Sequence, residues 1–224
     1  MSTPTSIEAL LERAEQLAGR SLKDIAAKQN WTVPANLLRT KGWIGQLIEN
    51  ALGASAASLP MPDFPELGVE LKTIPVDHTG KPRESTYVCV VPLTAEPGQL
   101  WENSLLWRKL QCILWVPILA NPELPIAERI IGTPFLWRPT DEEIRILRND
   151  WEEFMDCINM GQVETITARQ GLYLQIRPKA ADHHALTSGV NSEGKLMRTL
   201  PRGFYLRPQF TQNVLQCCTA QKNT

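Results

Sequence analysis

Two carboxylates and one amine stand close together in the first half of this 224-residue chain. Six residues separate Asp63 from the run Glu70-Leu71-Lys72. Cutting a phosphodiester needs positive charge near the scissile phosphate and a hydroxide made from water, and Mg²⁺ held by carboxylate oxygens supplies both. An amine beside them can orient the water or stabilise charge developing on the phosphate. These residue types are those of a metal-dependent nuclease.

A strand is expected to position this group. Residues 67–76 alternate apolar with polar side chains, which predicts a half-buried strand with Glu70 and Lys72 on one face. Asp63 lies in the proline-rich stretch 60–65, which cannot continue a helix and can turn back beside the strand. A Glu-x-Lys triplet also arises by chance in a chain of this length, so the alternative is an ion pair on an exposed strand face.

A third carboxylate interrupts the apolar side of a predicted helix over residues 43–52. Glu49 has Gly45 and Gly53 as its neighbours four residues away, so another segment or a metal ion can approach its carboxylate closely. Gly53 is also the expected end of the helix. The alternative is a surface glutamate on an ordinary amphipathic helix.

Several longer motifs, spread over most of the chain, resemble the MutH family of DNA mismatch-repair endonucleases and occur in that family's order. They are Lys41-Gly42-Trp43-Ile44-Gly45, Leu52-Gly53-Ala54-Ser55-Ala56, Leu67-Gly68-Val69-Glu70-Leu71-Lys72-Thr73-Ile74-Pro75, Ile166-Thr167-Ala168-Arg169, Gln175-Ile176-Arg177-Pro178-Lys179-Ala180 and Leu200-Pro201-Arg202-Gly203-Phe204-Tyr205-Leu206. A set of this length is far more specific than the catalytic triplet alone.

The resemblance implies a role for each member of the catalytic group. Glu49, Asp63 and Glu70 match the family's metal-binding carboxylates, and the cofactor it implies is Mg²⁺, as one or two ions. Lys72 matches the catalytic lysine, and Lys109 matches a second active-site lysine.

The resemblance also implies a substrate and partners. Lys41, Glu84, Arg177, Lys179 and Tyr205 match positions associated with DNA contact. The family nicks the unmethylated strand of double-stranded DNA at hemimethylated GATC sites, and the tyrosine matching Tyr205 is linked to sensing the adenine methyl group. Family members act when recruited and activated by the mismatch-repair proteins MutL and MutS. We expect a monomer in solution.

The fold expected from the patterns and the resemblance is α/β. It is a restriction-endonuclease-like mixed central sheet flanked by helices, with two lobes that form a DNA cleft. We expect residues 1–224 to make a single endonuclease domain, with an N-terminal catalytic lobe and a C-terminal DNA-reading lobe. Further strands are predicted over residues 87–93 and 113–118, which are rich in branched apolar residues.

In the expected reading lobe, residues 164–169 and 172–177 alternate around Gln170-Gly171, which predicts a hairpin with Leu172 facing the core. Arg177 would then face outward, where an arginine can contact a guanine edge. A second short strand would point Tyr205 outward. Without the resemblance, surface cations and an interfacial tyrosine of unknown use would be the alternative.

Charge is segregated along the chain, although the net charge is only −1. Residues 140–164 hold eight acidic and two basic side chains, and residues 169–208 hold seven basic and two acidic ones. The basic segment suits phosphate binding. The acidic segment begins with the capping box Thr140/Glu143 and continues at helical spacing, which predicts a long amphipathic helix. Its outward face is a solvated surface or, as an alternative hypothesis, the MutL-docking face.

Composition narrows the class of protein. With 43% apolar residues the chain can bury one substantial core. Five cysteines without a Cys-x-x-Cys pair argue against a disulfide framework and a zinc knuckle. We see no secretory signal, membrane span, Walker loop or Gly-x-Ser-x-Gly elbow, so we expect a bacterial cytoplasmic protein with no membrane partner.

Two other functions remain open at this point. One is a restriction endonuclease that cuts both strands at GATC, and the other is a catalytically silent DNA-binding adaptor.

Overall fold

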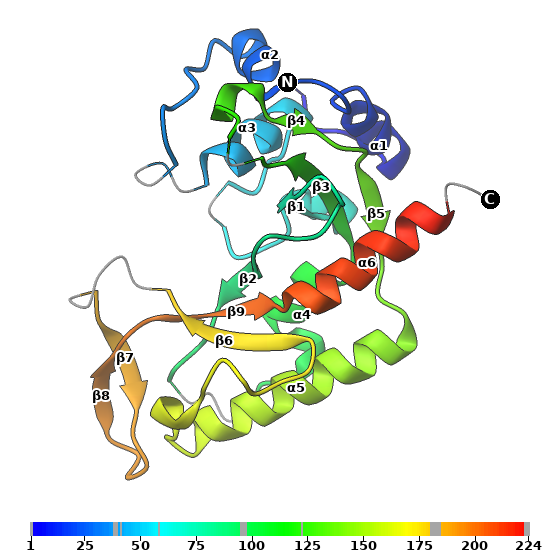
Figure 1. Ribbon diagram of the computed structural model, residues 1–224. Helices are drawn as coiled ribbons and strands as arrows, with labels where there is room; N and C mark the ends of the chain where they lie inside the picture. Colours follow the sequence, from blue (N-terminus) through cyan, green and yellow to red (C-terminus); the bar gives the residue numbers. More distant parts are fainter. Residues whose placement is uncertain are drawn as a thin grey trace. The chain divides into compact units, whose positions relative to one another are not determined.

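The computed structural model describes residues 2–37, 40, 42–57, 59–94, 98–121, 123–179 and 185–221 (Figure 1). They fall into two compact units, neither of which is continuous in sequence. The first unit comprises Met1–Glu84, Lys109–Arg138 and Gln212–Thr224, and the second comprises Ser85–Arg108 and Pro139–Thr211.

A small mixed sheet organises the first unit. Strands β1 (Glu70–Val76) and β3 (Ile113–Leu119) run parallel, with Glu70 opposite Ile113. The other side of β3 pairs antiparallel with β4 (Ile130–Ile131) and β5 (Phe135–Trp137). Strand β3 is central in this sheet, and its first four side chains are buried. Such a position suits the nearly continuous apolar run that predicted a strand here.

Three helices pack their apolar stripes against this sheet: α1 (Ile7–Glu15), α2 (Leu22–Lys28) and α3 (Trp43–Leu52) (Figure 1). The predicted helix over 43–52 is confirmed, and it ends at Gly53 in the left-handed conformation with φ +81°. A Cβ at Gly53 would also lie 2.6 Å from the carbonyl oxygen of Ser2, so both the backbone and the packing require glycine there.

The second unit holds an antiparallel sheet in the order β2 (Thr86–Val90), β9 (Arg202–Leu206) and β6 (Leu174–Pro178) (Figure 1). Helix α5 (Asp141–Asn159) packs against β6, and the predicted capping box between Thr140 and Glu143 is present. Strands β7 (Thr187–Val190) and β8 (Leu196–Thr199) form a separate hairpin.

Helices α4 and α6 have residues in both units, and short 3-10 helices complete the described elements. Their bounds are α4 (Leu105–Leu110), α6 (Pro208–Gln221), η1 (Pro65–Leu67), η2 (Trp101–Asn103), η3 (Ile126–Glu128) and η4 (Val163–Thr165). The mixed α/β class is therefore confirmed. None of the helices described here is both long enough and apolar enough to span a membrane.

The predicted hairpin around Gln170-Gly171 is wrong. The first two residues of its first arm belong to the 3-10 helix Val163–Thr165, and β6 begins only at Leu174. Leu172 is 63% exposed instead of facing the core. Alternation alone could not reveal that β6 pairs with β9, a strand from a distant part of the sequence.

A buried carboxylate on α5 fixes the start of β6. Asp150 is only 6% exposed and accepts backbone hydrogen bonds from Leu172, Tyr173 and Leu174 at 2.7–2.8 Å. Gly171, at φ +81°, packs so tightly that an added Cβ would lie 2.3 Å from the carbonyl oxygen of Leu174. Asp150 therefore replaces the hydrogen bonds that a hairpin partner would have supplied.

Asp150→Asn should destabilise the protein, because an amide has only one acceptor oxygen for three backbone N–H groups. We expect the free energy of unfolding to fall by about 1–3 kcal/mol in urea denaturation. Glu153→Gln, an exposed change on the same helix, is the control and should stay within about 0.5 kcal/mol of wild type. Equal stabilities for the two variants would contradict this role for Asp150.

Candidate active site

Glu70 lies at the centre of the predicted catalytic group. Its side chain is 1% exposed and forms ion pairs with two lysines. Lys72 Nζ lies 2.5 Å from Oε1, and Lys109 Nζ lies 2.9 Å from Oε2. A carboxylate removed from water to this extent needs such partners, because an unpaired buried charge is costly.

The strand topology explains why Lys109 reaches Glu70. The parallel pairing sets Glu70 opposite Ile113, so the chain entering β3 arrives beside the start of β1. Helix α4 ends at Leu110, just before β3, and this brings Lys109 to the same point. Lys72 reaches Glu70 by a different route, as the next residue on that face of β1.

Asp63 turns back beside β1, as the proline-rich stretch predicted. One of its carboxylate oxygens, Oδ2, accepts a hydrogen bond from the Leu71 backbone N–H at 2.8 Å. The turn is closed by Phe64 and Val69, whose backbones are bridged at 2.9 Å. The predicted strand over 67–76 begins later than expected, at Glu70, because Pro65–Leu67 forms a 3-10 helix inside this turn.

Glu49 reaches the same group from α3. A Cβ on Gly45 would lie 3.6 Å from Glu49 Oε1 and 4.0 Å from Thr73 Oγ1 on β1, so the helix approaches the strand closely here. Burial, followed by repulsion from Asp63, raises the pKa of Glu49. Burial, followed by repulsion from Glu70, raises the pKa of Asp63. The three carboxylates therefore interact electrostatically.

The donor set fits a hard divalent cation in its chemistry. Carboxylate oxygens are the ligands that Mg²⁺ prefers, and a cation would relieve the repulsion that raises the two pKa values. Among the residues that the structure describes, no three acidic, histidine or cysteine side chains are already grouped to hold a metal. Both oxygens of Glu70 instead face ammonium groups, so a metal bound there would compete with Lys72 and Lys109 for this carboxylate.

A second set of predicted residues gathers on the sheet of the second unit. Tyr205 lies on β9, and the guanidinium carbon of Arg177 lies 5.8 Å from the centre of its ring. Lys179 follows β6, and its Nζ lies 3.4 Å from the ring centre of Tyr87. The exposed basic side chains and the tyrosine thus share one face, as predicted for Tyr205.

Two neighbours of this set, Tyr87 and Ser85, were not predicted from the sequence. Tyr87 on β2 packs against Tyr205, with ring centroids 5.4 Å apart. Ser85 Oγ accepts hydrogen bonds from Gln175 Nε2 at 2.8 Å and from Arg177 Nη1 at 3.3 Å. Alternation along residues 87–93 would have put Tyr87 on one strand face, but only the β2–β9 pairing reveals what it meets there.

Two other residues, Glu84 and Lys41, were also predicted to contact DNA. Glu84 is exposed in the stretch between β1 and β2, at the end of a segment of the first unit. Lys41 lies outside the residues that the structure describes.

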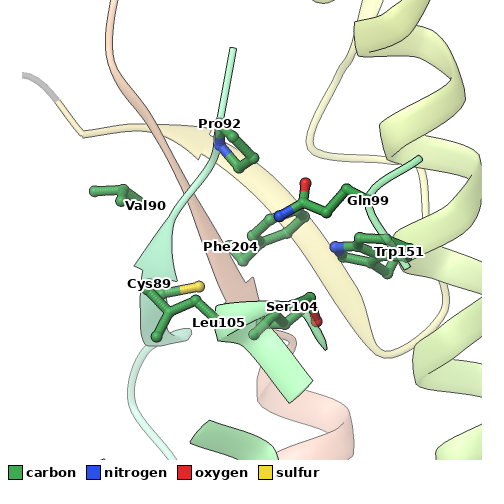
Figure 2. Close-up of a pocket in the computed structure, with 9 residues that line it drawn as sticks. Cys89, Val90, Pro92, Gln99, Ser104, Leu105, Trp151 and Phe204 are labelled. Carbon is green, nitrogen blue, oxygen red and sulfur yellow. The ribbon is translucent and has the colours of Figure 1, made fainter. Parts of the chain in front are cut away.

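The second unit contains a pocket of about 160 Å³ (Figure 2). Its lining is mostly apolar and includes Cys89, Leu105, Trp151 and Phe204. The hydroxyl of Ser104 at its wall is already used, since it donates to the Trp101 carbonyl at 2.7 Å. None of the predicted catalytic or DNA-binding residues lines this pocket.

Asp63→Asn should lower the pKa of Glu49 in metal-free protein, because it removes the largest charge repulsion acting on that group. Titration of the glutamate carboxyl carbons by ¹³C NMR in EDTA measures the change. Glu66→Gln is the control, since it removes a nearby exposed carboxylate that is not among the causes of the shift. An unchanged Glu49 pKa in Asp63→Asn would refute the coupling.

The raised pKa values also fix the sign of a pH effect on stability. Each group binds its proton more tightly in the folded chain, so stability is lost as pH rises from the ordinary carboxyl range through the raised values. In EDTA, the melting temperature of Asp63→Asn should therefore improve relative to wild type as pH rises towards neutrality.

Comparison with known proteins agrees with the resemblance. The family model for the DNA mismatch repair enzyme MutH matches residues 52–150, a range that includes Asp63, Glu70, Lys72 and Lys109. The DNA mismatch repair protein MutH of Vibrio vulnificus (strain YJ016) is 53% identical over 213 residues, covering 95% of this chain and 94% of the relative. The protein of the same name from Escherichia coli O6:K15:H31 (strain 536 / UPEC) is 54% identical over 215 residues, covering 96% and 94%. That from Shewanella sp. (strain W3-18-1) is 54% identical over 212 residues, covering 95% of each chain. The chain therefore belongs to the MutH family of DNA mismatch-repair endonucleases.

Proposed function

We propose that this protein nicks the unmethylated strand of DNA at hemimethylated GATC sites, in a magnesium-dependent reaction of methyl-directed mismatch repair. The observation that carries the proposal is the buried Glu70 carboxylate between Lys72 and Lys109, with Glu49 and Asp63 coupled to it. An enzyme of this family needs carboxylates and amines at one point for hydrolysis, and here they come from three separate segments of the chain.

In the proposed site, Glu49, Asp63 and Glu70 would hold Mg²⁺. The bound ion would supply a water of lowered pKa and positive charge at the scissile phosphate. Lys72 would orient the attacking water, and Lys109 would bind a phosphate oxygen once metal ligation draws Glu70 away from both ammonium groups. Each lysine is already mostly buried, at 14% and 13% side-chain exposure, so the protein restricts both side chains before DNA binds.

We assign sequence reading to the second unit. Arg177 can make a bidentate contact to a guanine edge, Lys179 can bind a base or a phosphate, and Tyr205 can pack against the adenine methyl position. Lys41 and Glu84 are proposed as further DNA contacts. In this scheme the chain acts as a single endonuclease domain, with a catalytic lobe and a reading lobe that hold one duplex in a cleft.

The proposed partners are MutL, as the direct activator, and MutS, acting through MutL. Membership of the MutH family supports this assignment, because nicking is useful in repair only when it follows recognition of a mismatch. The protein would act as a monomer, since one nick in one strand needs only one catalytic group.

Asp63→Ala should lower the nicking rate by more than about 100-fold, because even the partners that orient metal ligands are worth 10–100-fold. The assay uses a GATC duplex with a different label on each strand, in hemimethylated, unmethylated and fully methylated forms, with Mg²⁺ and MutL. Binding measured in Ca²⁺ should survive, and the exposed control Glu66→Ala should nick like wild type. Cleavage of both strands at equal rates in the hemimethylated duplex would indicate a restriction-type enzyme. Full activity in Asp63→Ala would overturn the site.

Tyr205→Phe should change the ratio of nicking rates between hemimethylated and fully methylated duplexes more than it changes the rate on the better substrate. The phenol is partly exposed on β9, where its hydroxyl can hydrogen-bond beside the methyl position. Single-turnover rates on the two duplexes measure the ratio. A ratio equal to that of wild type would exclude a sensor that depends on the hydroxyl.

A further inference from the structure

Tyr87 lies at the centre of the residues proposed to read DNA. It pairs with Tyr205 in the β2–β9 register, and the two rings meet edge to face at 63° with centroids 5.4 Å apart. The Lys179 ammonium lies 3.4 Å from the Tyr87 ring centre, within the range of a cation–π contact. One side chain on β2 therefore touches functional groups contributed by both β9 and the end of β6, which lie side by side in the sheet (Figure 1).

The two tyrosine rings close over the backbone of β9 at Gly203. A Cβ added there would lie 2.8 Å from Tyr87 Cε2 and 3.1 Å from Tyr205 Cε2. Among the described glycines, Gly203 is not one of those with positive φ, so other residues could adopt its backbone conformation. Space beneath the rings, not chain geometry, is what requires glycine at this position.

The residue just before β2 also binds Arg177, the remaining cation of this group. Ser85 lies two residues before Tyr87, and its hydroxyl accepts hydrogen bonds from Gln175 and Arg177. Gln175 is itself 6% exposed, so it is a buried support and not a contact for DNA. The segment Ser85–Tyr87 thus touches Arg177, Lys179 and Tyr205, the three side chains assigned to reading.

We propose that Tyr87 is a positioning residue for recognition: its ring, seated over Gly203, holds the Tyr205 phenol and the Lys179 ammonium in the arrangement that meets DNA. The inference depends on the proposed function, which assigns those two groups to DNA. A free lysine loses side-chain entropy when it binds a phosphate or a base, whereas one already resting on an aromatic ring loses less. Loss of the ring should therefore weaken binding and methyl discrimination, and leave the chemical step intact.

The test compares Tyr87→Phe and Tyr87→Leu with wild type and with Tyr173→Leu. Tyr173 is the matched control, because it is a tyrosine of the same unit whose ring stacks on Phe210, with ring centroids 4.3 Å apart. In Tyr87→Leu we expect KM on the hemimethylated duplex to rise about three- to tenfold and discrimination to fall, with kcat unchanged. Tyr87→Phe keeps the ring and should behave like wild type, as should Tyr173→Leu.

Proton NMR of the DNA-free protein supplies a readout that does not depend on activity. The side-chain protons next to Lys179 Nζ should be shifted upfield by the ring current in wild type and Tyr87→Phe, and should lose that shift in Tyr87→Leu. Should Tyr87→Leu fail to fold, Gly203→Ala tests the same idea, because its methyl group displaces both rings without removing them. It should raise KM and lower discrimination in the same direction.

Wild-type KM and discrimination in Tyr87→Leu, or in a folded Gly203→Ala, would overturn the inference. Failure of the proposed function is distinguishable from this. If wild type does not discriminate between methylation states, or if Tyr205→Leu leaves discrimination intact, the assignment of Tyr205 itself is wrong. If Tyr205→Leu loses discrimination while Tyr87→Leu keeps it, only the positioning role fails.

Discussion

The burial of the Glu70 carboxylate is the constraint on which the proposed catalytic group depends. A charge that is 1% exposed is tolerable only when it is paired, and Lys72 and Lys109 provide the pairing. Parallel pairing of β1 with β3 brings Lys109 to this point, since both strands start at the same end of the sheet. The sheet, the helix α4 that precedes β3 and the site chemistry are therefore linked through one side chain.

The electrostatic environment of Glu49 and Asp63 differs from that of Glu70. Burial raises both pKa values, and so does repulsion, which comes chiefly from Asp63 for Glu49 and from Glu70 for Asp63; the lysines act in the opposite direction as smaller effects. Without a metal, net repulsion therefore acts on Glu49 and Asp63, while both ammonium groups contact Glu70. In the proposed mechanism, a divalent cation held by these carboxylates would relieve that repulsion and compete with the lysines for Glu70. In the second unit β9 is the central strand, and its neighbours β2 and β6 carry Tyr87 and Arg177, which lie near Tyr205.

Local signals in the sequence were enough for much of the fold. The spacing in α3 with Gly53 as its stop, the capping box of α5, and the apolar run of β3 each depend on neighbouring residues, and each is confirmed. Alternation also placed Glu70 with Lys72 and pointed Tyr205 outward. The prediction that failed depended on contacts between segments that are distant in the sequence. The hairpin around Gln170-Gly171 was wrong because Asp150 satisfies the backbone that a hairpin would have paired.

The same difference between local signals and contacts between distant segments holds for the site residues. Lys109 was assigned by resemblance alone, because no local pattern reveals that a helix 39 residues after Glu70 returns to it. Tyr87 and Ser85 were not assigned at all, since their partners lie on strands far along the chain. Spacing predicts which residues share a face of one element, whereas packing between elements decides which of those residues meet.

The central claim is that Glu49, Asp63 and Glu70 bind a divalent cation beside a DNA phosphate. The most direct measurement is the anomalous scattering of Mn²⁺ in crystals of the protein with a hemimethylated GATC duplex. We predict a manganese peak bound by oxygens of these carboxylates, with Lys72 and Lys109 moved from Glu70 towards the phosphate. A manganese ion bound elsewhere, with both lysines still paired to Glu70 on bound DNA, would contradict it.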